Sequence, residues 1–272
     1  MRLIPKLLKS LGKEKDAEAV FKFYPKERLE PLFTPLHPGP ATIEVTNEDT
    51  LNAAIRLAGW VSSEEQQEHN PRPAILNFAD RDRPGGGWRN GALAQEEAIC
   101  YRSSLYWSLT GDPSHYPLRH GILYSPYVLV AKAADYEKLP GPAIELPTVS
   151  VLSTAAIRKP RVDEWKERSF TPAEARTKYV FARDQERDIT KLKMRLCLRI
   201  AAQHNHRVLV LGALGCGVYE NPPEDIAHCW LEVLRENEFS GNRWRKICFA
   251  VLDHRNQGIY EIFRQVLDGQ EV

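Results

Sequence analysis

Two adjacent glutamates lie a short distance after a run of three glycines, and together these residues suggest acid chemistry beside a bound ligand. The run Gly85–Gly87 is separated from Gln95, Glu96 and Glu97 by the seven-residue spacer Trp88–Ala94. Successive glycines remove every Cβ from one face of the backbone and permit positive φ, so main-chain amides can converge on an anion. An acid in the first turn of a helix is commonly only dipole-stabilising, at about 0.3 to 1 kcal/mol. That explanation accounts for one glutamate but not for the combination of three glycines, a short spacer and Gln-Glu-Glu. This combination indicates a carboxyl that faces a ligand.

A second glycine-rich loop, Gly212–Asn221, follows the short apolar run Val208–Leu211. Its glycines at 215 and 217 would leave neighbouring amides open to a phosphate group. A tight crossover from strand to helix would use the same glycines, and the loop has the spacing of neither a P-loop nor a Rossmann fingerprint. Ligands of open α/β sheets bind where strands end, so both glycine loops stand where a site is expected.

Composition limits the class of protein and its partners. The chain has 272 residues, with 37 Lys and Arg against 36 Asp and Glu, so no overall field attracts polyanions or anionic membranes. Five cysteines without a C-x-x-C pair favour a reducing compartment, and we expect an intracellular protein, cytoplasmic or nuclear, without membrane contact. The basic, leucine-rich residues 1–13 are a weak sign of organelle targeting.

Strand and helix patterns alternate along the chain. The expected strands are 42–45, 74–78, 122–131, 148–152, 208–211 and 247–252, and the expected helices are 51–58, 94–109, 189–200, 226–234 and 259–267. This alternation predicts a mixed sheet covered on both faces, a three-layer α/β/α sandwich. Five prolines in residues 24–40 predict an irregular connector, so we expect an N-terminal helical extension and connector at 1–40 and one domain at 41–272. Residues 132–147 and 158–170 are expected to be loops or insertions.

Other reactive or aromatic residues have plainer explanations. Cys216 has no paired histidine in the sequence. We therefore interpret it as a small side chain that points away from the loop, and not as a nucleophile. His204 and His206 are expected to be solvated turn residues, and the six tryptophans to be packing residues, with Trp88 the one candidate for ligand contact. For Arg81, Arg83 and Arg89, contact with an anionic polymer and a solvated loop remain equal alternatives. No residues have metal-ligand spacing, and we expect neither a metal nor a cofactor.

Both glycine loops resemble one known family. The stretch Leu76–Tyr106 (LNFADRDRPGGGWRNGALAQEEAICYRSSLY) resembles the signature of the compact, microbial-type poly(ADP-ribose) glycohydrolases, in which a triple glycine precedes Gln-Glu-Glu. The loop Gly212–Pro223 (GALGCGVYENPP) resembles that family's diphosphate-binding loop, with Tyr219 where phenylalanine is common. The resemblance covers about residues 41–267, covers 1–40 only loosely, and implies a macrodomain-like fold.

The resemblance also implies roles for individual residues. Glu97 would be the catalytic carboxyl, and Glu96 would hydrogen-bond ribose hydroxyls near the scissile bond. The implied substrate-binding residues are Asn77, Gly85, Gly86, Gly87, Gln95, Gly215, Cys216, Gly217, Val218 and Tyr219. Within this set, the first three glycines would approach the diphosphate and the distal ribose, the amides of 216–218 would bind the diphosphate, and Tyr219 would pack on the distal ribose.

The function implied by the resemblance is hydrolysis of poly(ADP-ribose), mainly at chain ends, with ADP-ribose as product. The partners of the protein would be the polymer or ADP-ribosylated proteins, and it would not recognise a nucleic-acid sequence. The protein would belong to the response to DNA damage. One acid suffices, because Glu97 can protonate the leaving oxygen and then activate water while the substrate diphosphate stabilises the oxocarbenium ion. A non-catalytic ADP-ribose reader and a mono-ADP-ribosyl hydrolase of protein or nucleic acid remain alternatives. A dinucleotide-dependent oxidoreductase is disfavoured, because neither loop contains G-x-G-x-x-G.

Overall fold

A seven-stranded mixed sheet forms the centre of the computed structural model, which describes residues 3–24, 27–30, 36–58, 70, 72–166 and 177–272. Its strands, in spatial order, are β1 (Phe21–Phe23), β4 (Ile122–Leu129), β5 (Thr148–Thr154), β3 (Ala74–Phe78), β8 (Val208–Leu211), β9 (Lys246–Ala250) and β2 (Ile43–Thr46). The five strands from β5 to β2 run parallel, whereas β4 is antiparallel to both of its neighbours. The carboxyl ends of the five parallel strands therefore meet at one edge of the sheet.

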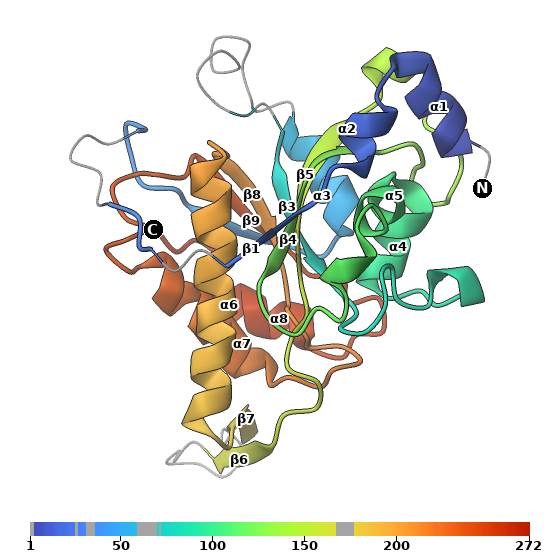
Figure 1. The fold of residues 1–272 in the computed structure, drawn as a ribbon. Helices are drawn as coiled ribbons and strands as arrows, with labels where there is room; N and C mark the ends of the chain where they lie inside the picture. Colours follow the sequence, from blue (N-terminus) through green and yellow to red (C-terminus); the bar gives the residue numbers. More distant parts are fainter. Residues whose placement is uncertain (1–2, 25–26, 31–35, 59–69, 71, 167–176) are drawn as a thin grey trace.

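Helices cover both faces of this sheet (Figure 1). One layer contains α3 (Thr50–Ala58), α4 (Gln95–Arg102) and α5 (Leu105–Leu109), and the other contains α6 (Asp184–Gln203), α7 (Pro223–Leu234) and α8 (Ile259–Leu267). Neighbouring strand residues point to opposite faces, so Ile75 packs in the core under the first layer and Leu76 in the core under the second. The predicted three-layer, macrodomain-like α/β/α sandwich is confirmed.

The N-terminal extension packs on this sandwich. Helices α1 (Leu3–Leu11) and α2 (Glu14–Glu18) bury apolar side chains against Leu129, Ala131 and Leu146. Strand β1, which the sequence did not predict, pairs with β4 at the sheet edge. The predicted helical extension is thus present, while the boundary at residue 41 stays a prediction. None of the helices in the described ranges combines the length and apolar character of a membrane span.

The single helix expected at 94–109 is wrong, because the chain breaks between α4 and α5 at two serines. Ser103 Oγ donates to Ile99 O at 2.7 Å and accepts from Leu105 N at 3.2 Å. Ser104 Oγ accepts from Leu129 N at 3.0 Å. Serine hydroxyls that bond the backbone compete with the helical pattern, and here they turn the chain at the end of α4.

The loop expected at 158–170 is wrong in its described part. It contains β6 (Val162–Lys166), which pairs antiparallel with β7 (Thr177–Phe181) in a separate two-stranded sheet, and residues 167–170 lie outside the described residues. Val162 and Trp165 are both exposed, so the hairpin has no buried face that a period-two pattern could reveal. Trp165 therefore is not the packing residue expected, and Trp60 lies outside the described residues.

Polar residues occupy buried positions at two further places. The helix expected at 189–200 lies within α6, where Ile189 and Leu192 are exposed and Thr190 and Lys193 are buried. His206, expected in solvent, is fully buried, with Nε2 2.9 Å from the Tyr124 hydroxyl and Nδ1 2.9 Å from Arg72 O. Burial lowers the pKa of His206 to about 4, which keeps the ring neutral. His204 stacks on Tyr124, with their ring centroids 4.1 Å apart.

Candidate active site

Helix α4 carries the two adjacent glutamates, and Gln95 fixes its first turn to the end of β3. Gln95 Oε1 accepts from Phe78 N at 2.8 Å, and Nε2 donates to Leu76 O at 2.7 Å and to Thr50 Oγ1 at 3.0 Å. These bonds use both polar ends of the Gln95 side chain inside the protein. Gln95, implied to bind substrate, here positions the helix.

The other end of α4 is held by a buried arginine. The Arg102 guanidinium pairs with Asp49 and donates to Asn52 Oδ1 at 2.7 Å, while Ala131 N donates to Arg102 O at 2.8 Å. Asp49 also caps α3, since its Oδ1 accepts from Leu51 N at 2.8 Å. A buried ion pair of this kind costs desolvation but is strongly destabilising to break, so α4 is fixed at both ends.

Glu96 is buried at the carboxyl end of β3. Its Oε2 accepts from Asp80 N at 2.7 Å, and its Oε1 accepts from Asn77 Nδ2 at 3.3 Å. Burial raises the pKa of Glu96 to about 8 against these two hydrogen bonds, and the nearby charge of Glu97 adds to the effect. Glu96 therefore holds a proton at neutral pH. Asn77 is itself fixed by a 3.0 Å bond from Nδ2 to Ser153 Oγ.

The glycine loop lies directly against the two carboxyls. Gly87 N donates to Glu97 Oε1 at 2.9 Å. Gly86 has φ of +56°, and a Cβ there would overlap Glu97 Oε1 and lie 3.3 Å from Glu96 Oε2. Gly85 has φ of +71°, and a Cβ there would lie 2.8 Å from Trp88 Cδ1. Both positions require glycine for backbone conformation and for space, as the close approach of a carboxyl pair to main chain demands.

The second glycine loop presents amides that the protein does not use. In the described part of the chain, the amides of Gly217, Val218 and Tyr219 donate to no protein acceptor, whereas Cys216 N donates to Ala213 O at 3.1 Å. Asn221 Nδ2 shapes the loop by donating to Gly215 O and Tyr219 O, each at 3.2 Å. Successive unpartnered amides form an anion-binding surface without net positive charge. Gly217 and Val218 belong to the set implied to bind the diphosphate, and the amide of Gly215 is likewise without a protein acceptor in the described residues, so diphosphate binding at this loop stays a prediction.

Tyr219 connects the two loops. Its hydroxyl accepts from Arg81 N at 3.1 Å, so the loop after β8 is bonded to the loop after β3. Burial raises the pKa of Tyr219, so the hydroxyl stays protonated. The structure therefore brings the residues that follow β3, the glutamates of α4 and the amides that follow β8 to one edge of the sheet.

Three further side chains near this edge did not stand out in the sequence. Asp80 Oδ1 accepts from Asp82 N at 2.8 Å and from Arg83 N at 2.9 Å, and an Asp two residues after a strand is the available signal for such a turn. The Tyr116 hydroxyl is buried without a partner in the described residues. Lys193 Nζ donates to Ala155 O, and burial lowers the pKa of Lys193 to about 8.

The described residues of this site offer neither a metal-ligand cluster nor a reactive thiol. Across the described ranges, no group of three or more His, Cys, Asp or Glu residues is arranged to hold a metal ion. The Cys216 thiol is buried, and burial raises its pKa, so it is a poor nucleophile. The absence of a metal or cofactor requirement stays a prediction.

Comparison with known proteins identifies the family. Residues 10–133 match the family model described as microbial-type PARG, catalytic domain. An X-ray structure of poly(ADP-ribose) glycohydrolase (PARG) from Thermomonospora curvata has a TM-score of 0.74 and 28% identity, over 92% of this chain and 86% of that one. A structure of the enzyme from the same organism, bound to the inhibitor ADP-HPD, is 30% identical over 83% of this chain and 78% of that one, with a TM-score of 0.66. This chain belongs to the microbial-type PARG family.

A third PARG structure extends the comparison to a second organism. The enzyme from Deinococcus radiodurans in complex with ADP-ribose is 30% identical over 84% of each chain, with a TM-score of 0.63. No curated protein sequence matches the chain significantly. The family recognised from the two loops is confirmed, and so is the prediction of an ADP-ribosyl glycohydrolase. The roles assigned to individual residues stay predictions.

Proposed function

We propose that this protein hydrolyses the ribose–ribose O-glycosidic bonds of poly(ADP-ribose) and releases ADP-ribose, mainly from chain ends. One observation carries the proposal: the buried carboxyl pair of α4 contacts the loop after β3, and that loop is bonded through Arg81 N and the Tyr219 hydroxyl to the loop that presents the unpartnered amides. Diphosphate fits the amides, and a glycosidic oxygen needs the acid. The complexes of PARG relatives with ADP-ribose and with ADP-HPD support the same ligand class.

Glu97 supplies the general acid and base. Its Oε1 is held by Gly87 N, and in the described residues its Oε2 has no hydrogen-bond partner, which leaves that atom for the substrate. Glu97 in its acid form gives its proton to the leaving ribose oxygen as the C1–O bond breaks. The substrate diphosphate, held on the amides of 217–219, stabilises the oxocarbenium ion at C1. The Glu97 carboxylate then takes a proton from the attacking water.

Glu96 orients the sugar in this proposal. Its two oxygens accept from Asp80 N and Asn77 Nδ2, and its proton at neutral pH gives it a donor for a ribose hydroxyl. A fixed hydrogen bond to the sugar holds C1 against Glu97, and such positioning supplies a large part of enzymatic rate enhancement.

The test is product analysis on the polymer. Purified protein should convert poly(ADP-ribose) to ADP-ribose, and Glu97→Gln should slow turnover by about 10²- to 10⁴-fold while binding ADP-ribose with similar affinity. If Glu97→Gln hydrolysed the polymer as fast as the original protein, a residue other than Glu97 would be the general acid. If the polymer stayed intact although the protein bound ADP-ribose tightly, the protein would be a non-catalytic ADP-ribose reader. Faster hydrolysis of mono-ADP-ribosylated protein than of polymer would favour the mono-ADP-ribosyl hydrolase.

The cellular setting is proposed on two grounds. The five cysteines are all free, buried thiols, which fits a reducing intracellular compartment, cytoplasmic or nuclear. A place in the response to DNA damage rests on the proposed substrate alone. Imaging of a tagged protein before and after DNA damage tests both, and exclusive secretion would contradict them.

A further inference from the structure

Lys193 is a buried ammonium that the mechanism above does not use. It lies on α6 with 8% of its surface exposed, and its Nζ donates to Ala155 O and, at 3.4 Å, to Arg119 O. In the described residues no carboxylate pairs with it. The groups whose charge acts on Lys193 are Arg81, of like sign, and the Cys197 thiol, whose pKa burial raises to about 12. Since buried charges are costly unless they are paired, this ammonium leaves a positive charge available to its surroundings.

Both carbonyl partners of Lys193 belong to loops at the edge of the sheet that carries the site. Ala155 directly follows β5, one of the parallel strands whose carboxyl ends meet at this edge. Arg119 lies shortly before β4, which is antiparallel to β5 and so begins at the same edge. Its neighbour Leu118 donates from N to Arg81 O at 2.7 Å, which joins this loop to the loop after β3. Lys193 therefore ties together two loops that frame the site.

The segment 155–159 lies along the loop that presents the free amides. Lys159 N donates to Tyr219 O at 2.8 Å, and Asn221 Nδ2 donates to Ile157 O at 2.7 Å. Because these bonds join the two segments, a displacement of the first displaces the second.

The same two segments touch closely at a glycine. Gly215 has φ of +77°, and a Cβ there would lie 2.5 Å from Ala156 Cβ. Lys193 holds Ala155, the residue before Ala156, so a shift there reaches Gly215 through packed atoms. Gly215 lies two residues before the free amides of 217–219.

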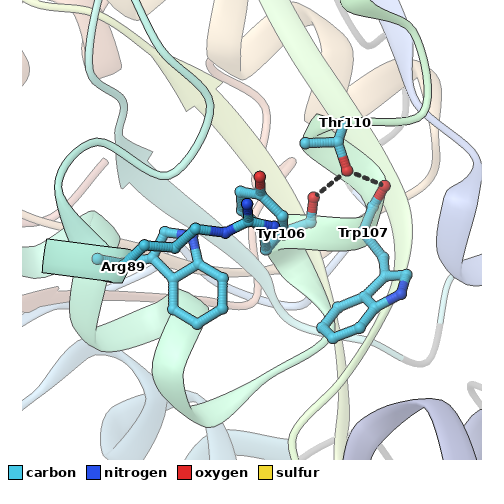
Figure 2. Close-up of a pocket in the computed structure, with 5 residues that line it drawn as sticks. Arg89, Tyr106, Trp107 and Thr110 are labelled. Atoms are coloured by element: carbon cyan, nitrogen blue, oxygen red, sulfur yellow. Dashed lines mark hydrogen bonds between the residues drawn. The ribbon is translucent and has the colours of Figure 1, made fainter. Parts of the chain in front are cut away.

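Two other cations near the glycine loops have partners of their own. Arg89 extends toward Tyr106 in an aromatic pocket (Figure 2), and its guanidinium lies 4.7 Å from the Tyr106 ring centroid. Lys159 Nζ pairs with Glu220 Oε1 at 2.7 Å. Lys193 differs from both, because it is buried and in the described part of the chain has only carbonyl oxygens as partners.

We infer that Lys193 supports the binding of diphosphate, an inference that rests on the proposed function. Its ammonium holds the segment 155–159 against the loop of free amides and supplies a positive charge that these neutral amides lack. Because this charge attracts the diphosphate, protonation of Lys193 and binding of ADP-ribose favour each other, as thermodynamic linkage requires. Lys193 is a positioning residue, which acts on the ligand through the loop and through its charge.

This coupling has a measurable size. Burial lowers the pKa of Lys193 to about 8, so the side chain titrates in an accessible range. A preference of about tenfold for the charged form is typical of opposite charges several ångströms apart near a protein surface. It would raise the Lys193 pKa by about one unit on binding, with uptake of about half a proton near about pH 8.5. The affinity for ADP-ribose would fall about tenfold as the pH rises from about 7 to about 10.

Calorimetry in two buffers of different ionisation enthalpy measures this proton uptake. The protein carries Glu96→Gln and Glu97→Gln, so neither carboxyl of the site ionises. Binding of ADP-ribose at about pH 8.5 should take up about half a proton. Adding Lys193→Met should abolish the uptake and lower the affinity at about pH 7 about tenfold, and thermal unfolding checks that this protein is folded. The control Lys191→Met removes the same charge from α6, where Lys191 pairs with Glu232 at 2.9 Å, and should preserve both uptake and affinity.

A second variant and a separate activity assay distinguish the possible failures. Lys193→Gln keeps a neutral donor and should likewise take up no proton. Binding without uptake by the protein that retains Lys193, or equal uptake after both substitutions, overturns the inference. If the protein with both glutamates hydrolyses the polymer but uptake is independent of Lys193, the proposed function stands and the role of Lys193 is wrong. If the polymer stays intact but uptake depends on Lys193, the proposed function is wrong and the role of Lys193 stands.

Discussion

Replacing Glu96 by glutamine should change how the stability of the protein depends on pH. Glu96 is 2% exposed, and burial raises its pKa from an ordinary value of 4.5 to about 8. Between these values the folded state binds more protons than the unfolded state, so the free energy of unfolding falls as pH rises. The loss begins near pH 4.5 and is complete near pH 8. At about 1.4 kcal/mol per pKa unit, the folded state loses on the order of 5 kcal/mol of stability across this window.

The Glu96→Gln variant cannot ionise and should lack this loss. Glutamine has the same shape and keeps an oxygen that can accept from Asp80 N, while its NH2 loses the 3.3 Å bond from Asn77 Nδ2 equally at both pH values. Urea unfolding of both proteins at about pH 5 and about pH 8 gives the difference in free energy of unfolding at each pH. That difference should move in favour of the variant by several kcal/mol between the two conditions. The control Glu145→Gln removes an exposed carboxyl and should leave the pH dependence unchanged. Parallel pH profiles for the original protein and Glu96→Gln would refute the reasoning.

Three further substitutions test the geometry of the site. Gly86→Ala should lower kcat/KM more than 100-fold because its Cβ overlaps the Glu97 carboxyl. The control Gly91→Ala is also at positive φ but faces open space, so it should cost only about 1 to 2 kcal/mol of stability and retain turnover. Equal activities of the two variants would contradict the steric argument. Tyr219→Phe loses the 3.1 Å hydrogen bond from Arg81 N and should cost about 0.5 to 1.5 kcal/mol of stability in thermal unfolding. Its affinity for ADP-ribose, measured by calorimetry, should change only a few fold. A 100-fold loss of affinity would show that the hydroxyl contacts the ligand. Arg102→Leu leaves the Asp49 charge unpaired and should cost about 3 to 5 kcal/mol in urea unfolding. Most of this should be recovered when Asp49 is also replaced by asparagine, which removes the charge and keeps the oxygen that caps α3. A loss below about 1 kcal/mol would contradict the role of this ion pair in fixing α4.

The candidate site was predictable from sequence where its signals are local. The glycines of both loops and the two glutamates follow strands within a few residues, so their common place at the sheet edge follows from the fold class. The roles of Gln95 and Arg102 in positioning α4 were not predictable, because their hydrogen-bond and ion-pair partners lie on other elements, such as Thr50 and Asp49 at the start of α3. The bond from Arg81 N to Tyr219 likewise joins residues that only the folded sheet brings together.

The fold was predictable where apolar periodicity matches burial. The helix at 259–267 and the strands at 74–78 and 208–211 are found with the same bounds. Prediction failed where buried positions are polar, as at Lys193 on α6, and where apolar residues such as Trp165 are exposed. Strand β1 has three residues and forms only by pairing with β4, so no period in the sequence could identify it.

The placement of ADP-ribose in a crystal of this protein tests the central claim most directly. With the diphosphate oxygens on the amides of Gly217, Val218 and Tyr219, C1 of the distal ribose should lie within reach of Glu97 Oε2, close enough for one water between them. A sugar that points away from Glu97, or a diphosphate bound on side chains elsewhere, would contradict the account.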